Sequence, residues 1–137
     1  MDYVSIAKEL LSIRAKLMQV PANKKMNEFT KGELYVLNYL DKHSGTAYPK
    51  DISREMQVST ARIAAILGQM ERKDWIERAS DAEDTRQIIV SLTQRGTDFL
   101  RAKEEEIIGS VVSMLENLGE DDSKELLRIQ CKMMKKI

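Results

Sequence analysis

The side chains best suited to covalent or metal chemistry are scarce in this chain. His43 is the single histidine and Cys131 the single cysteine among 137 residues. A multi-histidine zinc site, a thiolate metal cluster and a disulfide within the chain therefore cannot be built. A Ser-His-Asp triad would have to use His43. We accordingly expect no metal site, no cofactor and no enzymatic activity.

Three carboxylates crowd one short polar segment, where they could suggest a metal site or an acid–base pair. Asp81, Glu83 and Asp84 lie between two stretches rich in β-branched residues, 75–79 and 87–92. Such stretches predict a β-hairpin, and a flexible hairpin tip without a histidine is a poor place for catalysis. Asp84 is therefore expected to serve another purpose.

A second group of residues could read nucleic acid. Ser59 is a favourable N-cap for a helix over 60–73, and the first half of such a helix can contact base edges. Arg62 can make a bidentate contact with guanine, and Thr60 can reach a phosphate or a thymine methyl group. In the alternative interpretation, Ser59 is only a cap and Arg62 only a solvated arginine. The candidate DNA contacts are Ser59, Thr60, Ala61, Arg62, Ala65 and Gln69.

Apolar periodicity predicts the elements before this helix. Steps of three and four residues predict a helix over 3–20 that ends at Pro21, followed by a loop over 21–28. Thr30 and Glu33 have the spacing of a capping box for the next helix, which runs to about His43.

The elements around the candidate DNA contacts follow from their caps. Pro49 favours the first turn of a short helix to about Met56, which forms a helix-turn-helix unit with 60–73. The hairpin comes next. Thr93 is expected to cap a helix that ends at Leu118, and a last helix follows Gly119.

This order predicts a mainly α fold with a small β-hairpin wing, a winged helix-turn-helix with terminal dimerisation helices. Nothing obvious within the chain covers the apolar faces of the terminal helices, so we expect a homodimer. The predicted divisions are an N-terminal dimerisation helix and loop over 1–28, the DNA-binding region over 29–96 and C-terminal dimerisation helices over 97–137. Together they are expected to form one structural domain.

The stretch from Phe29 to Gly96 resembles the MarR family of dimeric winged-helix regulators of antibiotic-resistance, stress and catabolic operons. The resemblance implies a ligand-responsive repressor that binds a pseudo-palindromic operator in double-stranded DNA. The matching segments are Leu34–Leu40, Val58-Ser59, Met70–Arg78, the pattern Asp81-x-x-Asp84-x-Arg86, and Val90-Ser91-Leu92-Thr93-x-x-Gly96.

In this family an arginine at the position of Arg86 enters the minor groove, held by an aspartate at the position of Asp84. The physics agrees, because a narrow A·T-rich minor groove concentrates negative potential. The alternative is a surface ion pair that contributes less than about 1 kcal/mol.

The chain departs from the family at two places. Members often carry Ser or Thr and then Arg where this chain has Ala64 and Ala65, so specificity is expected to rely more on thymine methyl groups, the wing and DNA shape. Asp74 replaces a common glycine at the end of the same helix, and aspartate tolerates a left-handed backbone better than most residues.

The resemblance also implies an effector pocket for a small aromatic or phenolic ligand between the dimer helices and the winged helix. Arg14, Tyr35, Tyr39 and His43 are the candidate contacts, and each is also an ordinary half-buried residue. The peroxide-sensing branch of the family carries its reactive cysteine in the N-terminal helix, where this chain has none. Cys131 is therefore expected to be a buried interface thiol.

Charge and hydropathy narrow the class of protein further. Lys plus Arg and Asp plus Glu are both 22, which excludes a histone-like polycation. Residues 57–80 carry four basic and three acidic side chains, whereas 103–137 carry six and eight, so the acidity lies away from the expected DNA face. A winged-helix protein–protein adaptor without specific DNA reading is the alternative function.

No apolar run is long enough to span a membrane and no signal peptide is evident, so we expect a cytoplasmic protein.

Overall fold

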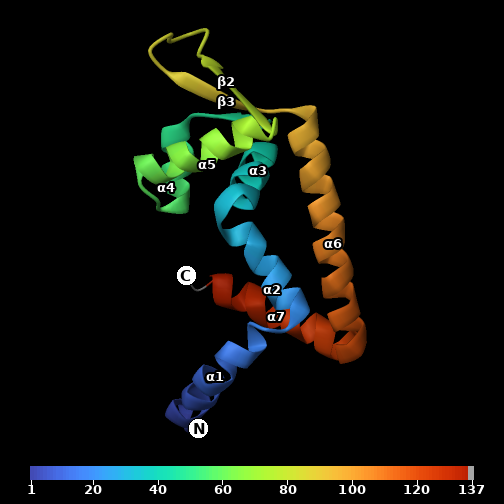
Figure 1. The fold of residues 1–137 in the computed structure, drawn as a ribbon. Coiled ribbons are helices and arrows are strands. Elements are labelled where there is room, and N and C mark those ends of the chain that lie inside the picture. Colours follow the sequence, from blue (N-terminus) through green and yellow to red (C-terminus); the bar gives the residue numbers. More distant parts are fainter. Residues whose placement is uncertain (136–137) are drawn as a thin grey trace. The chain divides into compact units, whose positions relative to one another are not determined.

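The computed structural model describes residues 1–135, and the chain forms two compact units. One unit comprises Met26–Glu104, and the other comprises Met1–Lys25 with the chain from Glu105 onward. These limits differ somewhat from the divisions expected at 28 and 96. The elements in chain order are α1 (Tyr3–Leu17), α2 (Pro21–Met26), the 3-10 helix η1 (Asn27–Thr30), α3 (Gly32–Lys42), β1 (Thr46–Ala47), α4 (Pro49–Met56), α5 (Thr60–Arg72), β2 (Ile76–Ser80), β3 (Ile88–Leu92), α6 (Gln94–Leu118) and α7 (Glu120–Lys135) (Figure 1).

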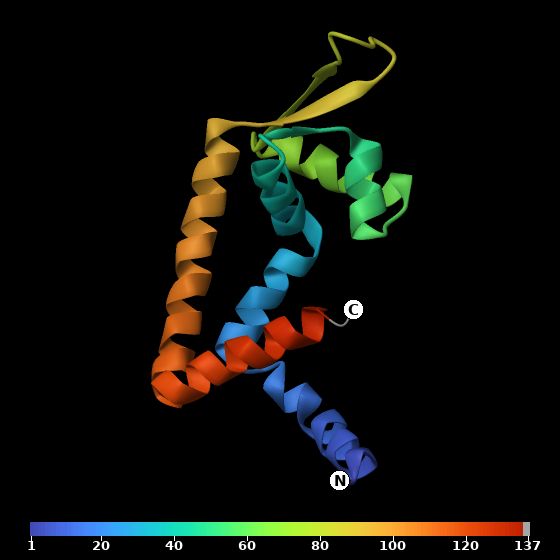
Figure 2. The same cartoon turned by 180° about the vertical axis from the view of Figure 1, so that it is seen from behind.

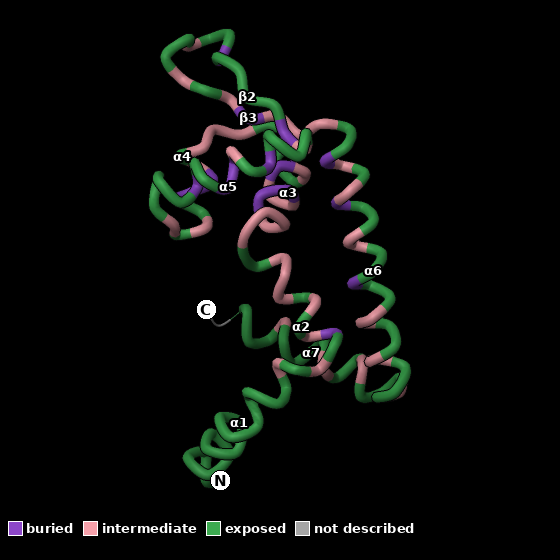
Figure 3. Tube along the Cα trace, viewed as in Figure 1, coloured by how far each residue is buried: buried purple, intermediate pink, exposed green. Residues whose placement is uncertain are grey.

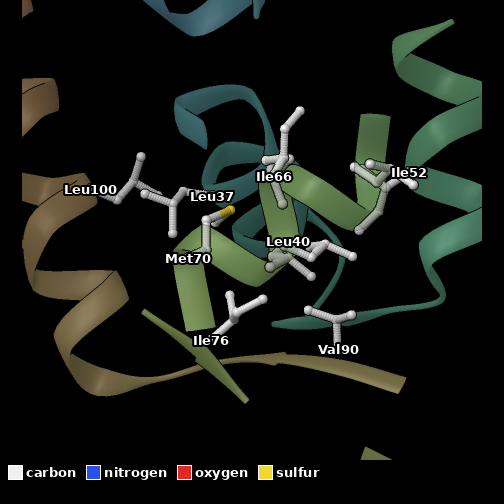
Figure 4. Packing of buried hydrophobic residues seen from close by; sticks show 11 residues of the cluster. Leu37, Leu40, Ile52, Ile66, Met70, Ile76, Val90 and Leu100 are labelled. Atoms are coloured by element: carbon white, nitrogen blue, oxygen red, sulfur yellow. The ribbon is translucent and has the colours of Figure 1, made fainter. Parts of the chain in front are cut away.

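The unit over 26–104 is built on one hydrophobic core. Figure 4 shows side chains from three helices, the sheet and the start of α6 meeting there. Truncating a buried leucine of such a core to alanine costs about 2–5 kcal/mol. The fully buried members drawn and labelled are Leu37, Leu40, Ile52, Met70, Ile76, Val90 and Leu100.

The predicted hairpin is part of a three-stranded antiparallel sheet with the order β1-β3-β2. Val90 in the central strand pairs with Ala47 on one side and Arg78 on the other. In both views of the ribbon the loop between β2 and β3 extends away from α4 and α5 as a wing (Figures 1 and 2). The mainly helical winged fold expected from the sequence is confirmed, and β1 is an addition to it.

The exit from the wing is tied to the turn after α5. The Thr93 hydroxyl accepts a hydrogen bond from the Gly96 amide (3.0 Å) and donates one to the Asp74 carbonyl (2.6 Å), which confirms Thr93 as the cap of α6. Asp74 has φ +62°, so it adopts the left-handed conformation predicted for it. The rings of Trp75 and Phe99 stack with centroids 4.1 Å apart. The turn, β2 and α6 are therefore joined at one point.

Two predictions before α3 were wrong. Residues 21–28 are not a loop, because Pro21 opens the short helix α2 and η1 follows it directly. Proline fits a first helical turn, where its missing amide costs nothing. Thr30 and Glu33 do not form a capping box: Lys31 occupies the N-cap position, the Thr30 hydroxyl donates to the Asn27 carbonyl (2.7 Å), and Glu33 pairs with Lys73 (2.9 Å).

The other unit has little core of its own. Every residue of α1 is exposed on the single chain, as Figure 3 shows, and the buried apolar residues of the unit are Ala22 and Ile107. Folded domains rarely leave so many large apolar side chains in water. Those left exposed on α1 and α7 include Ile6, Leu10, Ile13, Leu17, Leu127, Ile129, Met133 and Met134.

Candidate nucleic-acid interface

Helix α5 has one buried and one exposed face. Ile63, Ile66, Leu67 and Met70 are buried against the core. The helical period then turns the intervening residues toward solvent. All six candidate DNA contacts are exposed: Ser59, Thr60, Ala61, Arg62, Ala65 and Gln69.

The start of α5 is fixed by its cap. The Ser59 hydroxyl accepts a hydrogen bond from the Arg62 amide (3.0 Å), which confirms the predicted N-cap. Its hydroxyl proton and second lone pair stay available. The backbone of Arg62 is thereby held in the first helical turn, while its guanidinium lies in solvent.

The turn between α4 and α5 sets the angle of the helix-turn-helix. Gln57 adopts φ +57° and ψ +45°, a left-handed cap, and its amide donates to the Arg54 carbonyl. The amide of Val58 donates to the Ser53 carbonyl at 3.0 Å. These bonds satisfy the last carbonyls of α4 in the manner of a Schellman cap. Helix α5 therefore leaves the turn in a defined direction.

The wing loop presents one cation to solvent. The side chain of Arg86 is 89% exposed, and its Nε donates to the Asp84 carboxylate at 3.1 Å. The backbone amide of Arg86 donates to the same oxygen at 3.1 Å. Both residues lie in the loop between β2 and β3 and not on a strand. Asp84 orients Arg86 through a local turn instead.

The hydrogen bonds from Arg86 hold the pKa of Asp84 below its ordinary value. Lys50, in the first turn of α4, contributes a smaller attraction in the same direction. Asp84 thus stays ionised at neutral pH. The Asp84 carboxylate binds the guanidinium of Arg86. Arg86 keeps further N–H donors for a phosphate or a base edge.

Sequence reasoning did not find the contact that anchors the wing loop. Asp81 is 8% exposed, and its carboxylate accepts hydrogen bonds from the Tyr48 hydroxyl and the Glu83 amide. The bond to Asp81 raises the pKa of Tyr48. The sequence places Asp81 in the acidic trio and in the wing pattern but assigns it no partner, because Tyr48 lies 33 residues away, beyond the reach of any local pattern.

Three of the four candidate effector residues lie along α3 and at its C-terminal end. Tyr35, Tyr39 and His43 stack along α3, with the Tyr39 and His43 rings 3.9 Å apart. Burial raises the pKa of Tyr35, and nearby Glu55 raises it further. Arg14 is on α1 in the other unit.

A hollow of about 340 Å³ in the unit over 26–104 is lined by residues other than the candidate effector contacts. The stacked Trp75 and Phe99 lie there, with the Lys73 ammonium 4.6 Å from the Trp75 ring centroid. Glu28, Lys31 and Glu33 complete its polar rim. Tyr35, Tyr39 and His43 are absent from this lining.

Within 1–135, no group of three or more His, Cys, Asp or Glu side chains is placed to hold a metal ion. The helices of the same stretch include none that is both long and apolar enough to cross a membrane.

The sheet order, the helix-turn-helix and the extended loop define a winged helix-turn-helix protein. The sequence profile of the MarR family matches residues 29–87. Over residues 29–87 the chain therefore matches the MarR family of winged helix-turn-helix transcriptional regulators. Since that family is not enzymatic, the expectation that the chain is no enzyme is confirmed.

Three similar proteins illustrate the relationship. The Bacillus subtilis (strain 168) "Uncharacterized HTH-type transcriptional regulator YdgJ" is 25% identical over 105 residues, which cover 77% of this chain and 62% of that relative. MepR, a transcription regulator of the Staphylococcus aureus multidrug efflux pump MepA, has a similar structure with TM-score 0.72, 22% identity and coverage of 94% and 96% of the two chains. A MepR mutant bound to an oligodeoxyribonucleotide matches with TM-score 0.59, 25% identity and coverage of 95% and 96%.

Proposed function

We propose that this protein is a cytoplasmic, homodimeric repressor that binds a pseudo-palindromic DNA operator and responds to a small ligand. The exposed face of α5 carries the proposal of DNA binding. It presents Arg62 and short side chains, while Arg86 extends from the wing of the same unit. A recognition helix and a wing arginine can contact neighbouring grooves of one duplex. The similarity to a MepR mutant bound to an oligodeoxyribonucleotide supports this reading.

The bare apolar side chains of the second unit support the proposal of a homodimer. Ile6, Leu10, Ile13 and Leu17 recur along α1 at steps of four, three and four, and each is more than 40% exposed on the single chain. That spacing is typical of a helix that packs along another helix. A second copy of the chain would cover these residues and would also place two α5 helices on one duplex.

The ligand response and the repressor role rest on the family resemblance. If a ligand binds beside Tyr35 and Tyr39, the electrostatics restrict its chemistry. Burial raises the pKa of both tyrosines most. Glu55 raises that of Tyr35 further, and Asp51 and Glu55 raise that of Tyr39 against a smaller opposing effect of Arg54. A negative neighbourhood opposes a bound anion, so a neutral aromatic or phenolic ligand fits this face better than an aromatic acid.

Selection from a random duplex library tests the DNA-binding proposal. At about 50–100 mM salt, where charge contacts still contribute, we expect an inverted repeat with half-site centres about 10 base pairs apart or a multiple of that spacing. Enrichment without symmetry, or none, would favour the protein–protein adaptor, for which Ala64, Ala65 and the zero net charge are the supporting observations.

Sedimentation of two matched variants tests the dimer. Leu10→Glu places a charge on the apolar stripe of α1 and is expected to dissociate or unfold the protein. Lys8→Glu changes charge on another face of the same helix and should leave the dimer intact. Deletion of 120–137 should cause aggregation or loss of the fold. A folded monomer that behaves well after that deletion would contradict the proposal.

A further inference from the structure

The base of the wing contains a buried carboxylate whose partners come from two different segments. The Tyr48 hydroxyl donates to one oxygen of Asp81, and the Glu83 amide donates to the other at 3.1 Å. Asp81 is 8% exposed. Burying a charge is costly unless it is hydrogen-bonded, so this carboxylate is held by its partners at one place.

The hydrogen bond between Tyr48 and Asp81 joins the segments that follow the two edge strands of the sheet, β1 and β2. Tyr48 directly follows β1 and occupies the N-cap position of α4, while Asp81 directly follows β2. Strand β3 lies between β1 and β2 in the sheet order. The hydrogen bond therefore links the wing loop to the first turn of the helix-turn-helix, at a point where backbone pairing between β1 and β2 is absent.

A series of hydrogen bonds within the wing loop connects Asp81 to Arg86. The amide of Asp81 donates to the Gln87 carbonyl, and the Gln87 amide donates to the Asp84 carbonyl, both at 2.9 Å. Asp84 in turn holds the guanidinium of Arg86. The wing loop thus starts at Asp81, and its last residue, Gln87, is hydrogen-bonded back to Asp81.

We propose that Tyr48 and Asp81 are positioning residues that hold the wing arginine in a fixed relation to the recognition helix. The inference rests on the proposed function, because it assumes that α5 and Arg86 contact the same duplex. With the bond in place, Arg86 reaches the minor groove at the flank of each half-site as soon as α5 engages the major groove. Without it, the wing must be ordered on binding, and ordering costs affinity.

Tyr48→Phe removes the hydroxyl and keeps the ring. We expect its preference for A·T-rich over G·C-rich flanks to fall about 3- to 10-fold, the size of one hydrogen bond. In an Arg86→Ala background the same substitution should change that preference no further, because residues that act through one another are non-additive. Tyr3→Phe, on exposed α1, is the matched control and should leave the preference unchanged.

A second pair of variants separates positioning from stability. Asp81→Asn keeps an acceptor for the Glu83 amide and a polar group beside Tyr48, so it should retain most of the flank preference. Asp81→Ala should lose it. Melting temperatures are measured beside each titration, and a loss equal on both flanks that follows unfolding would show a structural role alone and overturn the proposal.

The outcomes separate the two levels of inference. If the wild-type protein selects no operator, the proposed function fails. If it selects an operator and Arg86→Ala weakens the flank preference, yet Tyr48→Phe and Asp81→Ala leave it intact, the function stands and the positioning role is refuted. Additive effects of Tyr48→Phe and Arg86→Ala would refute it as well.

Discussion

Gly96 lies directly against the carbonyl group of Trp75. A Cβ atom built at Gly96 would be 2.2 Å from the Trp75 carbonyl oxygen and 2.9 Å from a methyl carbon of Leu92. The close approach lets Thr93 cap α6 while bonded to Asp74. A glycine at this position is therefore required by space, since its φ is not in the left-handed region.

Gly96→Ala is expected to destabilise the protein by about 1–3 kcal/mol or more, because backbone atoms must move to admit the methyl group. Gly109→Ala is the matched control in the same helix, where an added Cβ meets nothing within 4 Å. That change should stabilise by up to about 1 kcal/mol through helix propensity. Thermal melts at one protein concentration measure both, and equal melting temperatures for the two variants would contradict the packing argument.

Arg86→Ala should weaken operator binding by about 1–3 kcal/mol per contact while the melting temperature stays unchanged. The exposed guanidinium contributes little to folding, since surface ion pairs are weak. Asp84→Ala should weaken binding less, because the charge of Arg86 remains but loses its orientation. Titrations against duplexes with exchanged flanks test both variants. Unchanged affinity for Arg86→Ala would remove the wing from recognition.

Arg62→Ala should cost about 1–3 kcal/mol of operator affinity and relax specificity at one base pair of each half-site. The reason is that Arg62 is exposed on the first turn of α5, where a bidentate contact with guanine is possible. Arg128→Ala, on α7 and paired with Glu125, is the control and should bind DNA as the wild type does. A uniform loss across all sequences would instead assign Arg62 to the phosphate backbone.

The pair of Asp84 and Arg86 should be insensitive to pH above about 5. The pKa of Asp84 is lowered by the hydrogen bonds from Arg86, so the pair is fully formed above the ordinary aspartate pKa of about 3.9. It is lost only as pH falls through the lower folded value. The ratio of affinities for the two flank types should therefore stay constant from pH 8 to 5. A marked fall of that ratio within this range would contradict the role of Asp84.

Cys131→Ser should leave any response to peroxide unchanged. The thiol is half-buried on α7 among apolar neighbours in sequence, a setting for packing. We expect a modest loss of stability, measured by thermal melting, and the same DNA affinity before and after peroxide treatment as in the wild type. Peroxide-dependent release from DNA that disappears in the variant would establish a sensor instead.

The sequence predicted the elements whose ends are marked by local chemistry. Pro49, Ser59 and Thr93 each begin a helix as expected, because a fixed φ or a capping hydroxyl acts within one turn. Strand β1 was missed because two residues carry no periodicity, and their pairing depends on β3 far along the chain. The Glu33 capping box failed for a similar reason, since Lys73 offers that carboxylate a tertiary partner.

The candidate site shows the same division. The exposed face of α5 could be predicted from the buried period of Ile63, Ile66 and Met70. The contact between Tyr48 and Asp81 could not, because it depends on the sheet order that brings the two segments together. Base contacts by Arg62 and Arg86 stay a prediction. The structure shows that both side chains are exposed in the free protein.

The complete exposure of α1 on the single chain bears on the genetics of this regulator. In the proposed homodimer, subunits produced from two alleles would assemble through the same apolar stripe, whatever their wings and recognition helices carry. A mixed dimer with one subunit lacking Arg62 and Arg86 would engage only one half-site well, and the benefit of linking two sites would be lost. A defective allele would thus titrate intact subunits into inactive pairs and behave as dominant over the normal one.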